Sequence, residues 1–332
     1  MMVNHKQIIP NDDILRYYFY FMQERMSIFW RKYEGHEPLT EDPILKKYRF
    51  TNVYRACDRV SQYLIRDVIS KDIEDYTPQD MLLRILVYKI FNKIETWEYV
   101  EQVYGKIRIN HFDVTEISNL LSERRRCLPI FNNAYMMTGT HKKYNYLPSK
   151  HEKWLSMVKE EFLGNGVVES ILNVNSLEGV YRTLRKCSFL GDFLAYQFAI
   201  DFNYSPYLNY SENSFVKAGI GAIRGIKKCF VSYGDSFEDA IHYVHDNIDV
   251  LRARYGYTDF RPLPGHEPTL LDLQNCFCET DKYLREKVPT LQVGNIRIKQ
   301  KYNASRTRIL FSFPEKWGVE INQECTQKNL ME

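Results

Sequence analysis

A glycine and a carboxylate that follow one another across a helical stretch are the residues best suited to chemistry. Directly after Gly191, apolar and polar residues alternate at helical spacing. A helix that begins there would point free backbone N–H groups outward, where they suit a phosphate oxygen. At position 191 a side chain would obstruct either the turn or an approaching ligand. Glu212 follows in a polar cluster, 211–214, and is the first candidate for a catalytic carboxylate.

Asp201 is the second candidate carboxylate. It ends the helix that is predicted to follow Gly191. The alternative is that Asp201 only caps the helix or forms an ion pair within the core.

The elements that must position these residues are almost all helices. Helix-start patterns are clear at Thr77-Pro78 and at Thr269, which is followed three residues later by Asp272. The sequence predicts helices over 12–33, 51–69, 77–91, 96–104, 114–124, 129–137, 150–163, 167–172, 222–231, 236–255 and 269–286. Alternation within 291–314 (Ile296, Ile298, Ile309, Phe311, Phe313) allows a small C-terminal β-hairpin. We therefore expect a mostly all-α fold.

The predicted helix 51–69 has two distinct faces. One face is apolar: Val53, Cys57, Val60, Leu64 and Val68. The opposite face is polar: Asn52, Arg55, Arg59, Gln62 and Arg66. This polar face is either a solvated surface or the lining of a nucleic-acid pocket.

Composition is that of a globular protein with a large core: 332 residues, 44% hydrophobic, 26% charged and a net charge of +3. A nucleic-acid footprint must therefore be local rather than global. The seven cysteines are scattered and follow no zinc or iron–sulfur spacing, and the eight histidines show no metal-ligand pattern. We expect no metal and no cofactor, reduced thiols, a cytoplasmic location and no membrane association.

Three stretches of the sequence resemble a known helical family. They are residues 48–55 with Asp58-Arg59, residues 193–197 with Ile200-Asp201, and residues 272–275 with 279–283. The sequence resembles the helical domain of 5-hydroxymethyluridine DNA kinase and the α-glutamyl/putrescinyl thymine pyrophosphorylases. The order of Gly191 and Glu212 also looks like that of helix-hairpin-helix DNA glycosylases, which include antiphage enzymes that remove hypermodified bases.

The resemblance implies a helix-hairpin-helix glycosylase-like fold of two helical lobes. We expect a single domain over residues 1–320 and a C-terminal tail over 321–332, frayed at its end.

The resemblance also implies roles for particular residues. The base pocket would contain Asn52, Arg55, Asp58, Arg59, Gln197, Asp272, Asn275, Glu279 and Asp281. The DNA backbone would contact Gly191, Arg224, Lys227 and Lys228. The alternative for each group is a solvated face, with ion pairs such as Glu279 with Lys282.

The main hypothesis is a DNA glycosylase that flips out and excises a hypermodified base, such as glucosylated hydroxymethylcytosine, from phage DNA, in antiphage defence. A carboxylate at Glu212 would stabilise the positive charge that develops on the sugar, with Asp201 as its rival. No lysine follows Gly191 directly, so the enzyme would be monofunctional and leave an abasic site.

Two alternatives remain. One is an amino-acid or polyamine transferase that displaces pyrophosphate from phosphorylated hydroxymethyluracil in DNA. The other is a non-catalytic DNA-binding module. In each case the partner is double-stranded DNA that carries modified bases, and the protein is expected to be a monomer. The sequence has no Walker A motif, so kinase activity is not carried over, and the glycines at 219–225 do not fit a dinucleotide loop.

Overall fold

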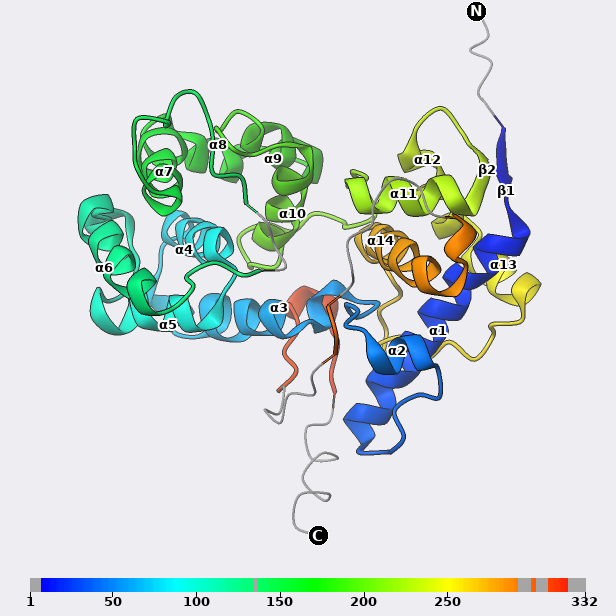
Figure 1. Cartoon of the computed structure of the whole chain (residues 1–332). Helices are drawn as coiled ribbons and strands as arrows, with labels where there is room; N and C mark the ends of the chain where they lie inside the picture. Colours follow the sequence, from blue (N-terminus) through cyan, green and yellow to red (C-terminus); the bar gives the residue numbers. More distant parts are fainter. Residues whose placement is uncertain (1–6, 134–136, 292–299, 303–309, 322–332) are drawn as a thin grey trace, which may run out of the picture. The chain divides into compact units, whose positions relative to one another are not determined.

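Helices make up nearly all the regular structure in the computed structural model, which describes residues 7–133, 137–291, 300–302 and 310–321 (Figure 1). The sheet found in these residues has two short antiparallel strands, β1 (Ile8–Pro10) and β2 (Phe230–Tyr233). The prediction of a mostly all-α fold is therefore confirmed. The strands pair the N-terminal segment with the residues after α11, a pairing that no local pattern in the sequence predicts.

The chain divides into two units. Unit 1 comprises Met1–Asp58, Phe215–Phe313 and Trp317–Glu332, and unit 2 comprises Arg59–Ser214 and Pro314–Lys316. The expected single domain over 1–320, with a tail over 321–332, stays a prediction.

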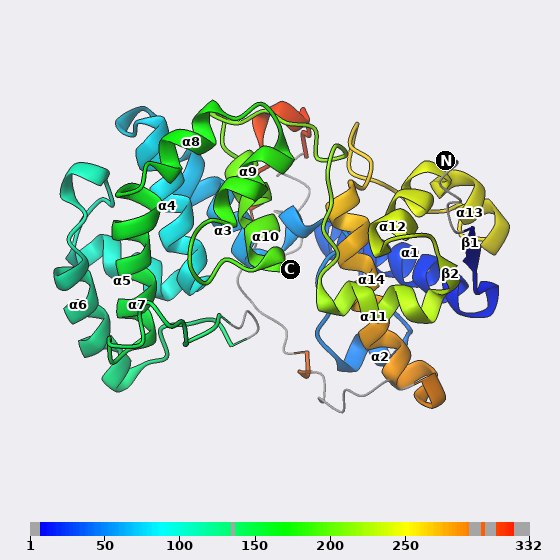
Figure 2. The same ribbon diagram turned by 90° about the horizontal axis from the view of Figure 1, so that it is seen from above.

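Unit 1 is built around the long helix α14 (Leu270–Lys287), which packs against α1 (Asp12–Glu34) and α11 (Ile220–Cys229) (Figures 1 and 2). Its other helices are α2 (Pro43–Lys47), α12 (Phe237–Asp246), α13 (Ile248–Tyr255) and the 3-10 turns Arg55–Cys57 and Pro289–Leu291. Aromatic side chains of α1 and α14 fill the core, with the rings of Tyr18 and Phe277 4.3 Å apart.

Two glycines let α11 lie directly on α14. A Cβ on Gly225 would lie 2.1 Å from the carbonyl oxygen of Phe277, and one on Gly221 would lie 2.3 Å from the sulfur of Cys278. A larger residue at Gly225 would meet the backbone of α14 and force the helices apart, whereas one at Gly221 would require the Cys278 side chain to move. The glycines at 219–225 therefore serve helix packing.

Unit 2 is a helical assembly in which α4 (Pro78–Phe91) is buried along almost its whole length. Its other helices are α3 (Arg59–Tyr63), α5 (Ile94–Val103), α6 (Val114–Cys127), α7 (Lys150–Met157), α8 (Val167–Asn173), α9 (Leu177–Leu184) and α10 (Asp192–Asn203). π-helical stretches at Leu64–Ser70 and Val158–Leu163 continue α3 and α7, and 3-10 turns occur at Ile73–Asp75 and Ile109–His111. A further 3-10 turn, Glu315–Trp317, has residues in both units.

The predicted helix 51–69 is wrong in its first half. Residues 51–54 are not helical, and a 3-10 turn (Arg55–Cys57) precedes α3. The Asp58 side chain accepts a hydrogen bond from the Asn52 N–H at 2.9 Å, so it offers the backbone an alternative to the helix. As a result, the predicted polar face does not exist as one surface.

Three smaller predictions also differ from the structure. Residues 129–133 and 137 are not helical, and the predicted helix 236–255 is divided at Asn247 into α12 and α13. Ile296, Ile298 and Ile309 of the predicted hairpin lie outside the described residues, whereas Phe311 and Phe313 are not in a strand.

Candidate functional sites

The turn between α9 and α10 in unit 2 is held in a strained conformation. Phe189 has a φ of 68°, a region that a bulky residue rarely adopts. Its ring stacks on those of Trp154 and Tyr144, at 4.8 and 5.6 Å between centroids. The N–H and the hydroxyl of Ser188 both donate to the buried carboxylate of Glu161, at 2.6 and 2.8 Å. These contacts stabilise a turn shape that the backbone alone would avoid.

Gly191 is the N-cap of α10, with φ −71° and ψ 175°, which any residue adopts. A Cβ at this position would have nothing within 4 Å. The interpretation that a side chain at 191 would obstruct the turn is therefore wrong. The open space is compatible with an approaching ligand, and contact with the DNA backbone stays a prediction.

An acidic side chain already lies at the start of α10. Asp192 forms an ion pair with Arg185 Nε at 2.8 Å and accepts a hydrogen bond from the Tyr181 hydroxyl at 2.8 Å. A phosphate bound at the start of α10 would lie beside the negatively charged Asp192 carboxylate. Repulsion between the two anions opposes phosphate binding at this helix end.

Glu212 is only 7% exposed, so its side chain does not extend into bulk water. It lies in the connection between α10 and α11, which the Asn203 side chain fixes in place. The amide group of Asn203 donates to the Tyr210 carbonyl and accepts from the Tyr210 N–H, both at 2.9 Å.

Lys316 approaches the same loop from much later in the chain. Its ammonium donates to the carbonyl oxygens of Asn203 and Leu208, the latter at 2.8 Å. Although the residue as a whole is exposed, burial around the ammonium lowers the pKa of Lys316 to about 8, and the charge of Glu212 opposes this shift. Sequence reasoning did not identify Lys316, because no local pattern connects it to Glu212.

Asp201 lies fully inside unit 2 and forms an ion pair with Lys89 of α4, with 3.3 Å between Nζ and Oδ2. This supports the alternative in which Asp201 pairs within the core. Gln197, one turn earlier on α10, is also buried.

In unit 1 the segment 51–58 is bound to α14 by a network of polar side chains. Asn275 Nδ2 donates to the Thr51 hydroxyl at 3.0 Å and to the Asn52 carbonyl at 3.2 Å. The Thr51 N–H donates to Glu279, which also pairs with Lys282. The structure therefore brings together predicted pocket residues that lie more than two hundred positions apart in the sequence.

Asp58 completes this network. It accepts from both the N–H and the Nδ2 of Asn52, at 2.9 and 3.0 Å. Burial raises the pKa of Asp58 to about 6, although the Asn52 hydrogen bond and the charge of Arg25 act in the opposite direction. Arg25 also donates to the Thr51 carbonyl at 3.0 Å, a contact that no local pattern in the sequence indicates.

Asp272 joins the start of α14 to the 3-10 turn at Arg55–Cys57. Its carboxylate caps α14 by accepting from Thr269 and also accepts from the Arg55 N–H at 2.9 Å. Burial raises the pKa of Asp272 to about 6, against the effect of these hydrogen bonds. Arg59 and Gln197, two further predicted pocket residues, belong to unit 2.

A second polar group in unit 1 surrounds Asp281 on α14. Lys228 Nζ lies 3.0 Å from Oδ1, Arg224 Nε lies 3.2 Å from Oδ2, and Arg285 also pairs with Oδ2. Lys228 is therefore directed inward rather than toward solvent, and Lys227 lies over the Phe237 ring. Of the predicted DNA-backbone cations, two are bound to one carboxylate.

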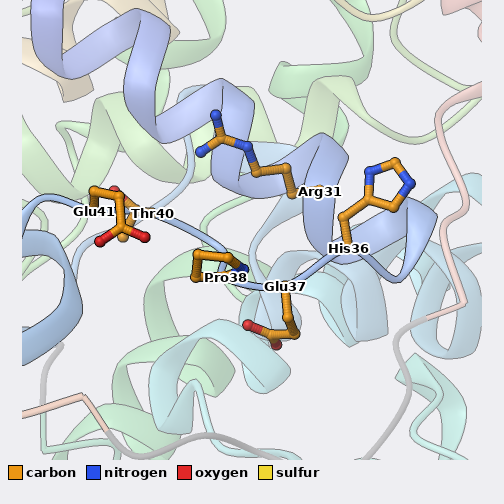
Figure 3. Close-up of a pocket in the computed structure, with 6 residues that line it drawn as sticks. All are labelled: Arg31, His36, Glu37, Pro38, Thr40 and Glu41. Carbon is orange, nitrogen blue, oxygen red and sulfur yellow. The ribbon is translucent and has the colours of Figure 1, made fainter.

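A surface hollow of about 300 Å³ lies at the C-terminal end of α1. Figure 3 shows its lining: Arg31, His36, Glu37, Pro38, Thr40 and Glu41. Several of these side chains pair with their own neighbours, as Thr40 does with Glu24. None of the predicted site residues contributes to it.

Within the described residues, no helix is long and apolar enough to span a bilayer. The same part of the chain contains no group of three or more His, Cys, Asp or Glu side chains placed to hold a metal ion.

Comparison with known proteins gives one family and one relative of interest. Residues 12–293 match the family described as "5-hmdU DNA kinase, helical domain". The chain is 23% identical over 287 residues to "5-hmdU DNA kinase" of Bacillus phage SP10, a match that covers 80% of this chain and 44% of the relative. The chain thus spans less than half of that relative's length. No solved structure gives a significant match.

These matches contradict the main functional hypothesis. The prediction of a DNA glycosylase, a hydrolase that excises a base, is wrong, because the matched family is named for transfer of a phosphoryl group to a modified nucleoside. Glu212 and Asp201 consequently lose their proposed roles at a sugar C1′. The alternative of a transferase agrees better with the family.

Proposed function

Because the chain belongs to the family of 5-hmdU DNA kinase helical domains, we propose that it binds DNA containing 5-hydroxymethyluracil and acts in group transfer at that base's 5-hydroxymethyl group. The match over residues 12–293 carries this proposal. It includes the stretches that build the network between residues 51–58 and α14.

The network between residues 51–58 and α14 is the proposed base-recognition site. Among the described contacts, Asn52 and Asn275 donate through Nδ2, which leaves their Oδ1 atoms as acceptors. The 5-hydroxymethyl group and the N3–H of an extruded pyrimidine are donors of matching type. Unmodified thymine has no such hydroxyl, so a site built to bind this hydroxyl would discriminate against it.

Two transfers at this group fit the family. In the first, the hydroxyl oxygen attacks the terminal phosphorus of a nucleoside triphosphate and loses its proton, and the nucleoside diphosphate leaves. In the second, an amine attacks the methylene carbon of the pyrophosphorylated base, the C–O bond breaks, pyrophosphate leaves with the electron pair, and the nitrogen loses a proton. The printed sequence contains no Walker A motif, which favours the second transfer for these residues acting alone.

The first test compares three duplexes that differ at one base: thymine, 5-hydroxymethyluracil or its pyrophosphorylated form. We expect tighter binding to both modified duplexes, measured by fluorescence anisotropy at several salt concentrations. Digestion to nucleosides and mass spectrometry, after incubation with ATP or with putrescine, identify the transfer. Equal affinity for all three duplexes without any product would contradict the proposal, and so would release of the free base.

A variant connects this function to the network. Asn275→Ala should remove the preference for the 5-hydroxymethyluracil duplex while leaving affinity for the thymine duplex unchanged. Asn173→Ala, at an exposed asparagine of unit 2, is the matched control and should keep the preference. If Asn275→Ala retains the full preference, the base is read elsewhere.

A further inference from the structure

The group around Asp281 carries more positive than negative charge. Three cations, Arg224, Lys228 and Arg285, pair with this single carboxylate, which gives a net charge of 3 − 1 = +2. The carbonyl end of α11 offsets part of the excess. A positive excess still remains on side chains that are only 26%, 4% and 16% exposed, respectively.

The packing of α11 on α14 fixes this arrangement. Because Gly221 and Gly225 allow the helices to touch, Arg224 and Lys228, one turn apart on α11, meet Asp281 and Arg285, one turn apart on α14. The Asp281 carboxylate thereby holds the guanidinium groups of Arg224 and Arg285 and the ammonium of Lys228 close together. Burial acts to raise the pKa of Asp281, but Lys228 and Arg285 hold it below its usual range, so the carboxylate stays ionised.

Cations that are withdrawn from water in excess of their counter-charge are stabilised by an added anion. Asp281 engages Arg224 through Nε, so the η nitrogens of this guanidinium remain as donors among the described contacts. Guanidinium forks match the oxygens of a phosphoryl group, and a dianion neutralises a charge of +2.

We propose that Arg224, Lys228 and Arg285, oriented by Asp281, form a binding site for a terminal phosphoryl group, either a phosphomonoester or pyrophosphate. The cations are recessed, with Lys228 almost completely buried, whereas the phosphodiesters of a duplex are monoanions that exposed side chains reach. A phosphoryl group that projects from a base or leaves as pyrophosphate reaches a recessed site more readily. The identity of the natural ligand rests on the proposed function, whereas the anion site itself does not.

The test uses sodium pyrophosphate and the whole chain. Isothermal titration calorimetry should show saturable binding to the wild-type protein. Arg224→Gln and Arg285→Gln should each weaken it by about tenfold. Arg182→Gln, at an arginine of unit 2 that is 74% exposed, should leave it unchanged. Absence of saturable binding, or equal binding to all four proteins, would overturn the site.

Asp281→Asn should change the affinity for pyrophosphate in the opposite direction from the arginine variants. Removing the one negative charge should strengthen pyrophosphate binding, whereas a purely structural cluster would bind no better after the change. Circular dichroism verifies folding of every variant, and the arginine variants decide the question if the asparagine variant unfolds.

Competition distinguishes the two sources of phosphate. Unmodified duplex DNA should not displace pyrophosphate, and displacement would assign the site to the DNA backbone and overturn the proposal. Pyrophosphate binding without any preference for 5-hydroxymethyluracil would contradict the proposed function and leave the anion site standing. A preference for the modified base without pyrophosphate binding would contradict the anion site and leave the proposed function standing.

Discussion

Two buried aspartates, one in each unit, show how the same side chain can have different consequences. Asp201 in unit 2 is 0% exposed and pairs with Lys89, while Asp281 in unit 1 is 1% exposed and pairs with three cations. The ion pair with Lys89, which is itself buried, places the Asp201 carboxylate in the core of unit 2. Asp281, in contrast, pairs with three cations, so the group has a net positive charge that a bound anion can neutralise. Burial of an acid therefore does not reveal its role until its partners are counted.

The largest effect should come from breaking the pair in unit 2. Lys89→Met leaves the Asp201 carboxylate buried without its ammonium, which should lower the free energy of unfolding by about 3–5 kcal/mol. Urea denaturation measures this loss. The double variant Lys89→Met/Asp201→Leu should recover most of it, because both charges are then absent. A single variant as stable as the wild type would show that Asp201 does not depend on Lys89.

The corresponding change in unit 1 should be smaller and should respond to anions. Asp281→Asn leaves three cations without their carboxylate, but Arg224 and Arg285 keep some solvent, so we expect a loss of about 2–3 kcal/mol. Added pyrophosphate should restore part of the thermal stability of this variant. The same addition should not restore Asp201→Asn, and a restoration of both would erase the distinction between the two aspartates.

Two glycines, Gly225 in unit 1 and Gly191 in unit 2, differ in how closely their surroundings pack. Gly225→Ala places a methyl group against the Phe277 carbonyl and should lower the free energy of unfolding by about 1–3 kcal/mol. It should also weaken pyrophosphate binding, since Arg224 and Lys228 move with α11. Gly191→Ala in unit 2 meets open space and should change stability by less than about 0.5 kcal/mol. Thermal unfolding of both variants checks the contrast.

Apart from the nearly neutral Gly191→Ala control, the smallest expected effect is a dependence on pH. The pKa of Asp58 in the folded chain, about 6, lies above its unfolded value, so the folded state binds the proton more tightly. Its contribution is complete below the unfolded pKa and is lost as pH rises through about 6. Since Asp58 keeps some solvent exposure, we expect its share of the unfolding free energy to fall by about 1 kcal/mol between pH 4 and pH 7.

Asp58→Asn should make this fall smaller, as denaturation at both pH values would show. Part of the fall should remain, because the pKa of Asp272 is also raised to about 6 and acts with the same sign. Asp281 should contribute with the opposite sign, because its pKa is lowered: its stabilisation is present at neutral pH and is lost only as pH falls through the folded pKa. An identical slope for the wild type and Asp58→Asn would assign the pH dependence to other groups.

Helix starts were the most predictable features. Thr77 accepts from the Asp80 N–H in a capping box, and Thr269 and Asp272 begin α14 as expected. These capping interactions join residues only three or four positions apart, so the local sequence is sufficient to predict them. The segment 51–58 could not be predicted in this way, because its polar groups bond to α14 instead of continuing a helix.

By itself, the sequence determined the helical class and several helix boundaries. It also determined the resemblance to the helical domain of 5-hydroxymethyluridine DNA kinase, which the family match confirms. Each of these depends on short patterns or on the order of residue types. Only the tertiary structure decided which charges meet. Lys316, in a 3-10 turn, reaches the Glu212 loop from more than a hundred residues later in the chain. Arg224 and Lys228 reach Asp281 because α11 packs on α14. The energy of an ion pair depends on distance and burial in three dimensions, and neither quantity is written in a linear spacing.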